Sequence, residues 1–257
     1  MRKLLGTWTA LVIVALYAPI AVMALFSFNA SPQIVVWKGF TIDWYAKALA
    51  NERARKCLFA TLTIASWSTL LATILGTCAA FASVRLSFPG KRAFNALVSI
   101  PISIPDVLMG LSLMIFFLAA GADLSQWTVI AAHATFSMAY VAVVVAARLQ
   151  GLDRSAELAA QDLGATPFGA FLRVTLPAIA PAVAAGALLA FALSLDDVVI
   201  TYFTSGPRVT TLPLYLYSRV RFSFTPEVNA LSTMMLGASV VLVLVATWLH
   251  RPAVGGK

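Results

Sequence analysis

Long apolar stretches alternate with polar segments along the whole chain. Six of the apolar stretches are about 20 residues or longer, which is the length a helix needs to cross the roughly 30 Å hydrocarbon core of a bilayer. They cover residues 4–28, 57–84, 93 to about 120, 126–147, 178–204 and 230–249. The pattern predicts an all-α protein with six transmembrane helices.

Composition supports lipid as the surrounding solvent. Apolar residues make up 61% of the 257 residues and charged residues only 11%, an apolar share too high for a soluble domain of this length. The polar segments 29–56, 148–177 and 205–229 hold 17 of the 28 charged residues and face water. The first stretch follows Arg2 and Lys3 as a signal peptide would, but it exceeds the roughly 7–15 apolar residues of such a peptide. We therefore expect an uncleaved first span.

The distribution of basic residues predicts the orientation in the membrane. An even number of spans places both termini on one side, and ten of the 18 Lys and Arg residues lie on that side. The short loop 85–92 carries three bases and the short loop 121–125 carries none, so the positive-inside rule favours cytoplasmic termini. The net charge of +8 is dispersed over both faces, which favours lipid contact and gives no reason to expect a nucleic-acid partner.

Several kinds of site are missing from the sequence. No Gly-x-x-x-x-Gly-Lys-Ser/Thr loop occurs, so any ATP must be hydrolysed by a partner. His133 and His250 have no companion at metal-ligand spacing, and His133 is interpreted as a hydrogen-bonding residue between helices. The sequence contains no Gly-x-Ser-x-Gly element, so it does not support an intramembrane protease. We expect no enzyme activity, no metal and no cofactor in this chain.

Segment 148–177 has the pattern of a helix-turn-helix. Asp153 is suited to cap a first helix, with Glu157 in its early turns. Gly164 lies where a left-handed helix end is needed. Pro167 is suited to the first position of a second helix, and Pro177 is expected to end it before the fifth span. By shape alone, the two short helices are as consistent with an ordinary loop as with a lever that docks on a soluble partner.

The same segment resembles the Glu-Ala-Ala coupling loop of bacterial ABC importer permeases. That pattern has Glu-Ala-Ala, three residues, Gly, and farther on a Leu-Pro pair. It falls here on Leu158, Ala159, Ala160, Gly164, Leu176 and Pro177. Leu158 departs from the pattern, because the motif glutamate is missing there, and Glu157 lies directly beside it. The resemblance implies that these residues couple the chain to an ATPase.

Almost the whole chain is similar to the spermidine/putrescine subgroup of these permeases. The similar segments are YAPIAVMALFSFNAS, IPDVLMGLSL, LSLDDVVITYF, SGPRVTTLPLYLYSRVR and TPEVNAL. The resemblance implies a single six-span permease domain over 1–257 in the bacterial inner membrane, with a cytoplasmic coupling loop at 148–177. It also implies a second, non-identical permease, two ATPase subunits that hold ATP and Mg²⁺, and a periplasmic polyamine-binding protein.

Two alternatives remain open. The first is a permease of the same type for another small solute, such as an amino acid, a phosphonate or thiamine. The second is a secondary transporter, which should show inverted repeats, and the sequence has no convincing internal repeat. The sequence does not separate putrescine from spermidine, since the external binding protein would set that choice.

Three aspartates are the candidates for the substrate path. Charged residues at bilayer depth are costly and usually face a cavity. Along straight helices Asp106 would lie about 20 Å from the inner end and Asp196 about 22 Å, so that their depths match. With Asp197 they would form an acidic ring suited to a linear amine, although one of the adjacent pair must point away and Asp106 could instead cap a broken helix. Tyr202 is a further candidate, and aromatic neighbours that could line the same path are Tyr140, His133 and Phe203.

Overall fold

The computed structural model describes residues 2–31, 36–222 and 225–249, without the side chains of 2–4, 222 and 242–249. Most of the described residues are helical and none forms a β-strand, so the all-α class is confirmed. Contacts divide the chain into two compact units, Met1–Leu58 with Tyr215–Leu244 and Phe59–Leu214 with Val245–Lys257. The single permease domain over 1–257 stays a prediction.

The first unit is held together by polar contacts near the ends of its helices. It contains α1 (Arg2–Phe26), α2 (Asp43–Ala50) and most of α12 (Pro226–Leu249). The indole of Trp44 donates to the carbonyl of Asn29 at 2.8 Å, which ties α2 to the turn after α1. The amide of Asn51 donates to Glu227 Oε1 at 2.7 Å, which ties the end of α2 to the start of α12.

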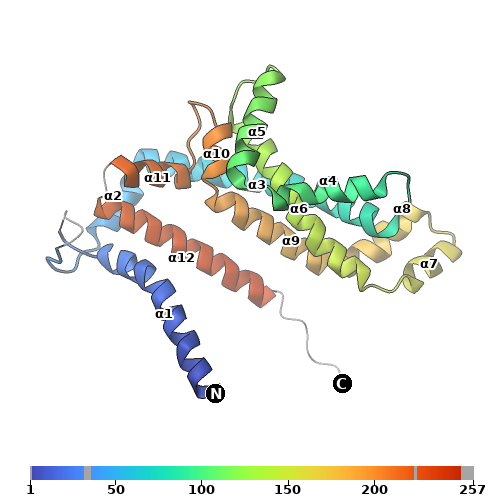
Figure 1. The fold of residues 1–257 in the computed structure, drawn as a ribbon, viewed down its shortest axis with the longest axis horizontal. Coiled ribbons are helices and arrows are strands. Elements are labelled where there is room, and N and C mark those ends of the chain that lie inside the picture. The colour runs from blue at the N-terminus through green and yellow to red at the C-terminus, as the bar shows by residue number, and fades with distance from the viewer. Residues whose placement is uncertain (1, 32–35, 223–224, 250–257) are drawn as a thin grey trace. The chain divides into compact units, whose positions relative to one another are not determined.

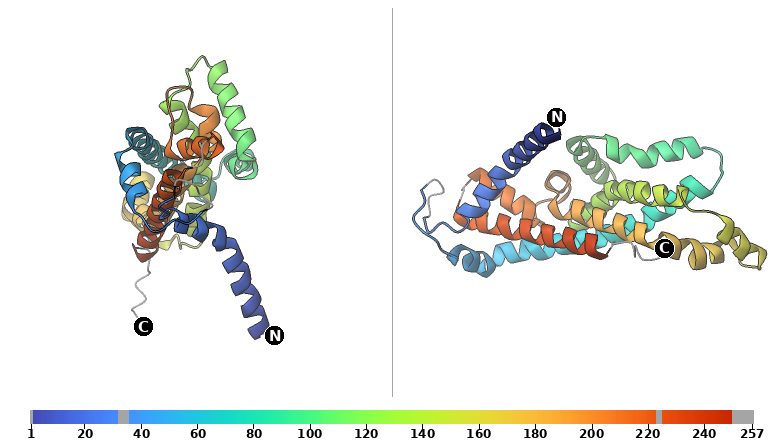
Figure 2. Two further views of the ribbon diagram at one scale, coloured as in Figure 1. Left: turned by 90° about the vertical axis from the view of Figure 1, so that its left-hand side faces the viewer. Right: turned by 90° about the horizontal axis from the view of Figure 1, so that it is seen from below.

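The second unit carries the predicted coupling loop and the predicted membrane aspartates. Its elements are most of α3 (Glu52–Arg85), α4 (Lys91–Ser103), α5 (Asp106–Ala119), α6 (Gln126–Gln150), α7 (Ser155–Asp162), α8 (Pro167–Ala170), the π-helical η1 (Phe171–Thr175), α9 (Leu176–Asp196), α10 (Val199–Thr204) and the start of α11 (Leu212–Phe222). Figures 1 and 2 show α6 and α9 side by side. The helix over 212–222 lies in the third of the predicted polar segments.

Small residues let α6 pack closely against its neighbours. A Cβ added to Gly76 of α3 would lie 2.6 Å from the carbonyl oxygen of Met138, and one added to Gly186 of α9 would lie 3.2 Å from Val141. Val141 and Val145 are fully buried in the core that these helices share. Close approach at small residues is typical of helices packed in a membrane, where no hydrophobic effect drives helices together.

The third predicted span is broken. α4 and α5 are bent by 114° at Ile104 and Pro105, which both have extended backbone conformations. The residue before a proline avoids the helical region, because the proline ring clashes with its backbone. The depth of Asp106 that was calculated along a straight helix is therefore wrong.

The fifth predicted span begins earlier and ends earlier than expected. α8, η1 and α9 form one helical run over Pro167–Asp196, so the prediction that Pro177 ends a separate helix is wrong. Proline lacks an N–H and clashes with the preceding turn, and the π-helical residues Phe171–Thr175 relax that turn. At its other end the run stops at Asp196, and α10 starts again at Val199.

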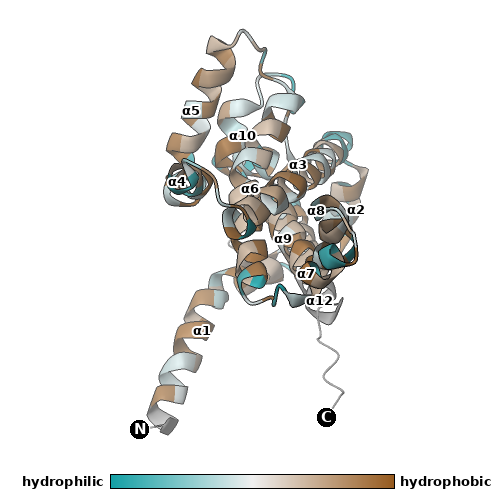
Figure 3. Ribbon diagram, turned by 90° about the vertical axis from the view of Figure 1, so that its right-hand side faces the viewer, coloured by the Kyte–Doolittle hydropathy of each residue, from teal (hydrophilic) through white to brown (hydrophobic). Residues whose placement is uncertain are grey.

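Most of the predicted spans are present. Among the described residues, Leu5–Phe26, α3, α6 and Pro167–Asp196 are long and apolar enough to cross a membrane, and the bent pair of α4 and α5 adds a fifth candidate. The sixth predicted stretch lies in α12, a helix of 24 residues whose side chains beyond 241 are outside the description. Figure 3 shows the hydrophobic colouring along α5 and α9 and hydrophilic residues at α7.

Candidate functional site

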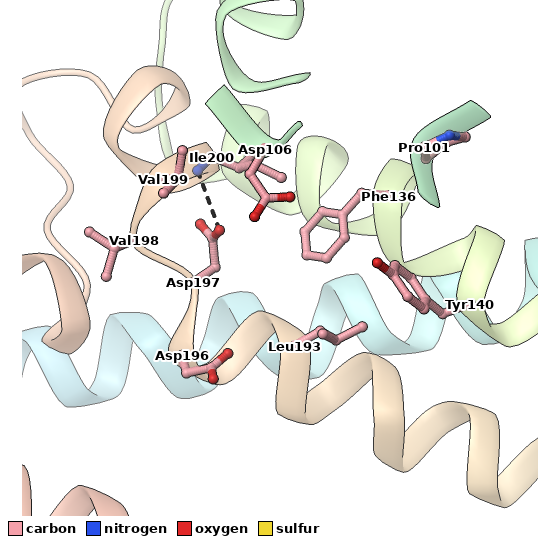
Figure 4. Close-up of a pocket in the computed structure, with 10 residues that line it drawn as sticks. All are labelled: Pro101, Asp106, Phe136, Tyr140, Leu193, Asp196, Asp197, Val198, Val199 and Ile200. Carbon is pink, nitrogen blue, oxygen red and sulfur yellow. Dashed lines mark hydrogen bonds between the residues drawn. The ribbon is translucent and has the colours of Figure 1, made fainter. Parts of the chain in front are cut away.

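A pocket of about 300 Å³ lies where the two broken helices meet α6. Its volume is at the lower end of the range for small-molecule sites. Figure 4 shows Asp106 and Asp196 on opposite sides of this pocket, with Asp197 between them. The lining residues are Pro101, Asp106, Phe136, Tyr140, Leu193, Asp196, Asp197, Val198, Val199 and Ile200. The structure thus brings the three predicted aspartates together.

Helix breaks place two of these carboxylates at the pocket. Asp106 is the first residue of α5, where the positive end of the helix dipole favours an acidic side chain. Asp196 is the last residue of α9, directly before the break. Both residues are exposed to the pocket, and no basic side chain of the described residues forms an ion pair with either. They are available to a cationic ligand.

Asp197 has a different role from its neighbour. Its Oδ2 accepts hydrogen bonds from the backbone N–H of Thr201 at 2.7 Å and from the Thr201 hydroxyl at 2.8 Å. Its Oδ1 accepts from the N–H of Ile200 at 3.3 Å. The imidazole Nε2 of His133 lies 3.2 Å from Oδ2. Asp197 therefore caps α10, and internal donors already occupy its carboxylate.

The aromatic candidates are only partly placed at the pocket. Tyr140 lines it, and so does Phe136, one helical turn earlier on α6. Sequence reasoning missed Phe136, although its spacing of four from Tyr140 was a usable signal. Tyr202 is 62% exposed and does not line the pocket. Phe203 packs instead against Gly110, where an added Cβ would lie 2.8 Å from its ring.

The predicted helix-turn-helix is present at the other end of the second unit. α7 is followed by Gly164 at φ +91°, the left-handed conformation expected there. Thr166 caps α8 by accepting from the N–H of Gly169 at 3.1 Å, and Pro167 is its first residue. Asp153 precedes the cap position of α7, and the hydroxyl and N–H of Ser155, which donate to its carboxylate, hold its pKa below the ordinary value.

Glu157 points into the protein, whereas Leu158 beside it points outward. Only 6% of Glu157 is exposed. Its Oε2 accepts from the Thr175 hydroxyl at 3.1 Å and lies 3.7 Å from Nε of Arg85, the last residue of α3. Leu158, at the place of the missing motif glutamate, is 49% exposed. The outward apolar surface of this segment comprises Leu158, Leu163 and Phe168.

Comparison with known proteins identifies the family of the chain. Residues 68–252 match the family described as the binding-protein-dependent transport system inner membrane component. The chain belongs to this family. The putrescine transport system permease protein PotI of Escherichia coli K12 is 45% identical to this permease over 245 residues, which cover 93% of the chain and 87% of PotI. The spermidine/putrescine transport system permease protein PotC of the same strain is 37% identical over 256 residues, covering 100% of the chain and 97% of PotC.

Solved structures of other transporters share the fold. A bacterial ABC transporter involved in import of the acidic polysaccharide alginate matches with a TM-score of 0.77 at 16% identity, covering 99% of this permease and 97% of that chain. The MetNI methionine ABC transporter, in inward-facing conformations, matches with a TM-score of 0.65 at 16% identity, covering 78% and 98%. The permease is a multi-pass inner-membrane protein with the fold of ABC importer permeases.

Proposed function

We propose that this permease forms, with a second and non-identical permease, the path by which an ABC importer carries putrescine or spermidine into the cell. Two ATPase subunits on the cytoplasmic side would hold ATP and Mg²⁺, and a periplasmic binding protein would deliver the polyamine. The names of PotI and PotC support this substrate class. The two termini would lie in the cytoplasm.

The acidic pocket is the observation that carries the proposal. A polyamine is an alkyl chain with an ammonium group at each end, so it needs separated negative charges with apolar surface between them. Asp106 and Asp196 supply carboxylates on opposite sides of the pocket, and Leu193 and Phe136 supply apolar surface. The ring of Tyr140 adds a face that attracts an ammonium group. A phosphonate or the carboxylate of an amino acid would be repelled by the same charges.

Asp106 and Asp196 bind the two ammonium groups in this proposal. Asp197 shapes the site by capping α10. Carboxylates inside a membrane protein are costly and are retained where they line a substrate path. Tyr202 lies outside this pocket, and we assign it no role there.

The coupling loop supplies the second part of the proposed function. α7 and the turn at Gly164 would dock on an ATPase subunit, with Ala159 and Ala160 allowing close approach. Leu158 faces outward at the motif position, so its contact with the ATPase would be apolar. Leu176 and Pro177 lie where η1 passes into α9, and they would carry a movement of the loop into the fifth span.

The loop also supports the orientation. Arg85 donates to the carbonyl oxygen of Leu152 at 3.2 Å, so the basic end of α3 and the coupling loop lie on one face of the second unit. An ATPase that docks on this loop is cytoplasmic, and the excess of basic residues beside it agrees with the positive-inside rule.

Uptake of labelled putrescine and spermidine by the complete importer in proteoliposomes tests the proposal. Asp106→Asn and Asp196→Asn should each lower the maximal uptake about tenfold, since each loses a charge-assisted hydrogen bond to an ammonium group. Asp123→Asn, on the exposed loop before α6, is the matched control and should change nothing. Uptake of an amino acid or thiamine in place of both polyamines would overturn the proposed substrate class.

A further inference from the structure

A buried polar cluster adjoins the acidic pocket at Asp197. We define the His133 cluster as Ser68 of α3, His133 of α6, Ser194 of α9, and Asp197 and Thr201 at the start of α10. Apart from Asp197, each of these residues is buried, and none of them but Asp197 lines the pocket. Four helices thus contribute polar side chains at one point.

The imidazole of His133 connects the two sides of the break between α9 and α10. Its Nδ1 lies 2.7 Å from the hydroxyl of Ser194, two residues before the end of α9. Its Nε2 lies 3.0 Å from the hydroxyl of Thr201 and 3.2 Å from Asp197 Oδ2, both beyond that end. Asp196 is between these anchors in the sequence, so the direction of its side chain depends on how they are held.

The hydrogen-bonding groups around Nε2 of His133 determine whether that atom carries a proton. Asp197 can only accept, and Thr201 donates its hydroxyl proton to Asp197 Oδ2. The Nε2 of His133 must therefore carry a proton and donate toward these two oxygens. In this arrangement the imidazole holds the Asp197 carboxylate against α10, where its oxygens are already occupied by internal donors.

The hydroxyls on the other side of the ring adapt to either charge state of His133. The Ser194 hydroxyl lies 3.0 Å from that of Ser68, which lies 3.2 Å from the carbonyl oxygen of Ala65. With neutral His133, Ser68 donates to Ser194, and Ser194 donates to Nδ1. With charged His133, the same chain reverses and ends on Ala65. Each hydroxyl of the cluster therefore has a hydrogen-bond partner in both states.

We propose that His133 is a positioning residue for transport: it fixes the break between α9 and α10, so that Asp197 serves the structure and Asp196 serves the substrate. This inference rests on the proposed function, because it concerns the carboxylate that meets the polyamine. It assigns different work to two adjacent residues of the same type. It also accounts for the presence of a histidine at a fully buried position that lines no part of the pocket.

Two substitutions of similar size distinguish the contacts of Nε2 of His133 from those of Nδ1. In His133→Gln the side-chain amide reaches the place of Nε2, so the contact with Asp197 is kept. In His133→Asn the shorter amide reaches only the place of Nδ1, so the contact with Ser194 is kept and that with Asp197 is lost. Maximal polyamine uptake per assembled importer should fall about tenfold in His133→Asn, as for a lost hydrogen bond to a charged group, and much less in His133→Gln.

A double-mutant cycle shows whether the effect passes through Asp196. In an Asp196→Asn background, His133→Asn should cause little further loss of uptake, because the carboxylate that it positions is already neutral. In an Asp106→Asn background the loss should stay near its full size, since Asp106 belongs to α5. The amount of assembled importer and the ATP hydrolysis without polyamine should match the parental protein in each case, which a role in folding alone would not predict.

The outcomes separate this inference from the function on which it rests. If the parental importer takes up no polyamine, the proposed function fails and the inference fails with it. If the parental importer transports polyamine and His133→Asn equals it, or if the His133 and Asp196 effects multiply independently, the inference alone is overturned. Should His133→Asn not assemble, Thr201→Val against Thr201→Ser poses the same question, since only serine keeps the hydroxyl beside Asp197. Equal uptake by those two variants would also overturn the inference.

Discussion

The ion pair between Glu157 and Arg85 should hold the coupling helix α7 to the end of α3. Both side chains are less than one-tenth exposed, and 3.7 Å separates Glu157 Oε2 from Arg85 Nε. Glu157→Gln keeps the volume and an acceptor for Thr175, but it leaves the buried guanidinium without its counter-charge. Breaking a buried pair on one side costs roughly 3–5 kcal/mol. Because Arg85 also donates to the carbonyl of Leu152, we expect the low end, about 3 kcal/mol.

Amide hydrogen exchange in α7 measures this loss directly. About 3 kcal/mol corresponds to roughly a hundredfold rise in the exchange rate of the α7 amides, since each 1.4 kcal/mol is a factor of ten. Polyamine-stimulated ATP hydrolysis should fall in parallel, because a loosened helix transmits less movement. Asp162→Asn, an exposed acidic residue on the same helix, is the matched control. In the double variant Glu157→Gln with Arg85→Gln no buried charge remains, so α7 should regain much of its protection.

The same assay distinguishes an outward role of Glu157 from the inward one. If Glu157 made an ionic contact with the ATPase, Glu157→Gln would weaken co-purification of the ATPase and leave α7 exchange in the isolated permease unchanged. That result, or parental exchange and parental hydrolysis together, would refute the idea that the Glu157–Arg85 ion pair holds α7 to α3. A double variant as impaired as Glu157→Gln would refute the electrostatic explanation and leave only a packing effect.

Three further predictions concern single positions. Gly164→Val should leave the importer assembled but abolish polyamine-stimulated ATP hydrolysis, because φ is +91° there; normal stimulation would contradict it. Asp196→Asn should lower polyamine uptake without lowering the melting temperature of the importer. Asp197→Asn should destabilise it by about 1 kcal/mol, because both carboxylate oxygens of Asp197 accept hydrogen bonds and the amide nitrogen of asparagine cannot accept one; equal melting temperatures of the two variants would contradict this division. Gly76→Leu should reduce assembly, because an added Cβ meets the carbonyl of Met138 at 2.6 Å, whereas Gly6→Leu, with nothing within 4 Å, should not.

Local rules in the sequence determined the helical class, most of the spans and the shape of the coupling loop. Apolar length decides whether a helix can cross a bilayer, and this property needs no knowledge of neighbours. The left-handed turn at Gly164 and the cap at Thr166 are likewise set by backbone sterics and one nearby hydrogen bond. Pro105 marked a break in the third span for the same reason. The cost of charges in lipid is also a local property, and it singled out the three aspartates.

Only the tertiary structure decided how these features meet. The placement of α5 against α10, beyond the bend of 114°, is something that a hydropathy pattern does not encode. Asp196 and Asp197 are identical residues in one stretch, and their separate roles arise because His133, far away in the sequence, reaches only Asp197. Glu157 was expected beside the ATPase, yet Arg85 draws it inward from another helix. Each of these outcomes depends on contacts between distant segments, whose energies no local pattern contains.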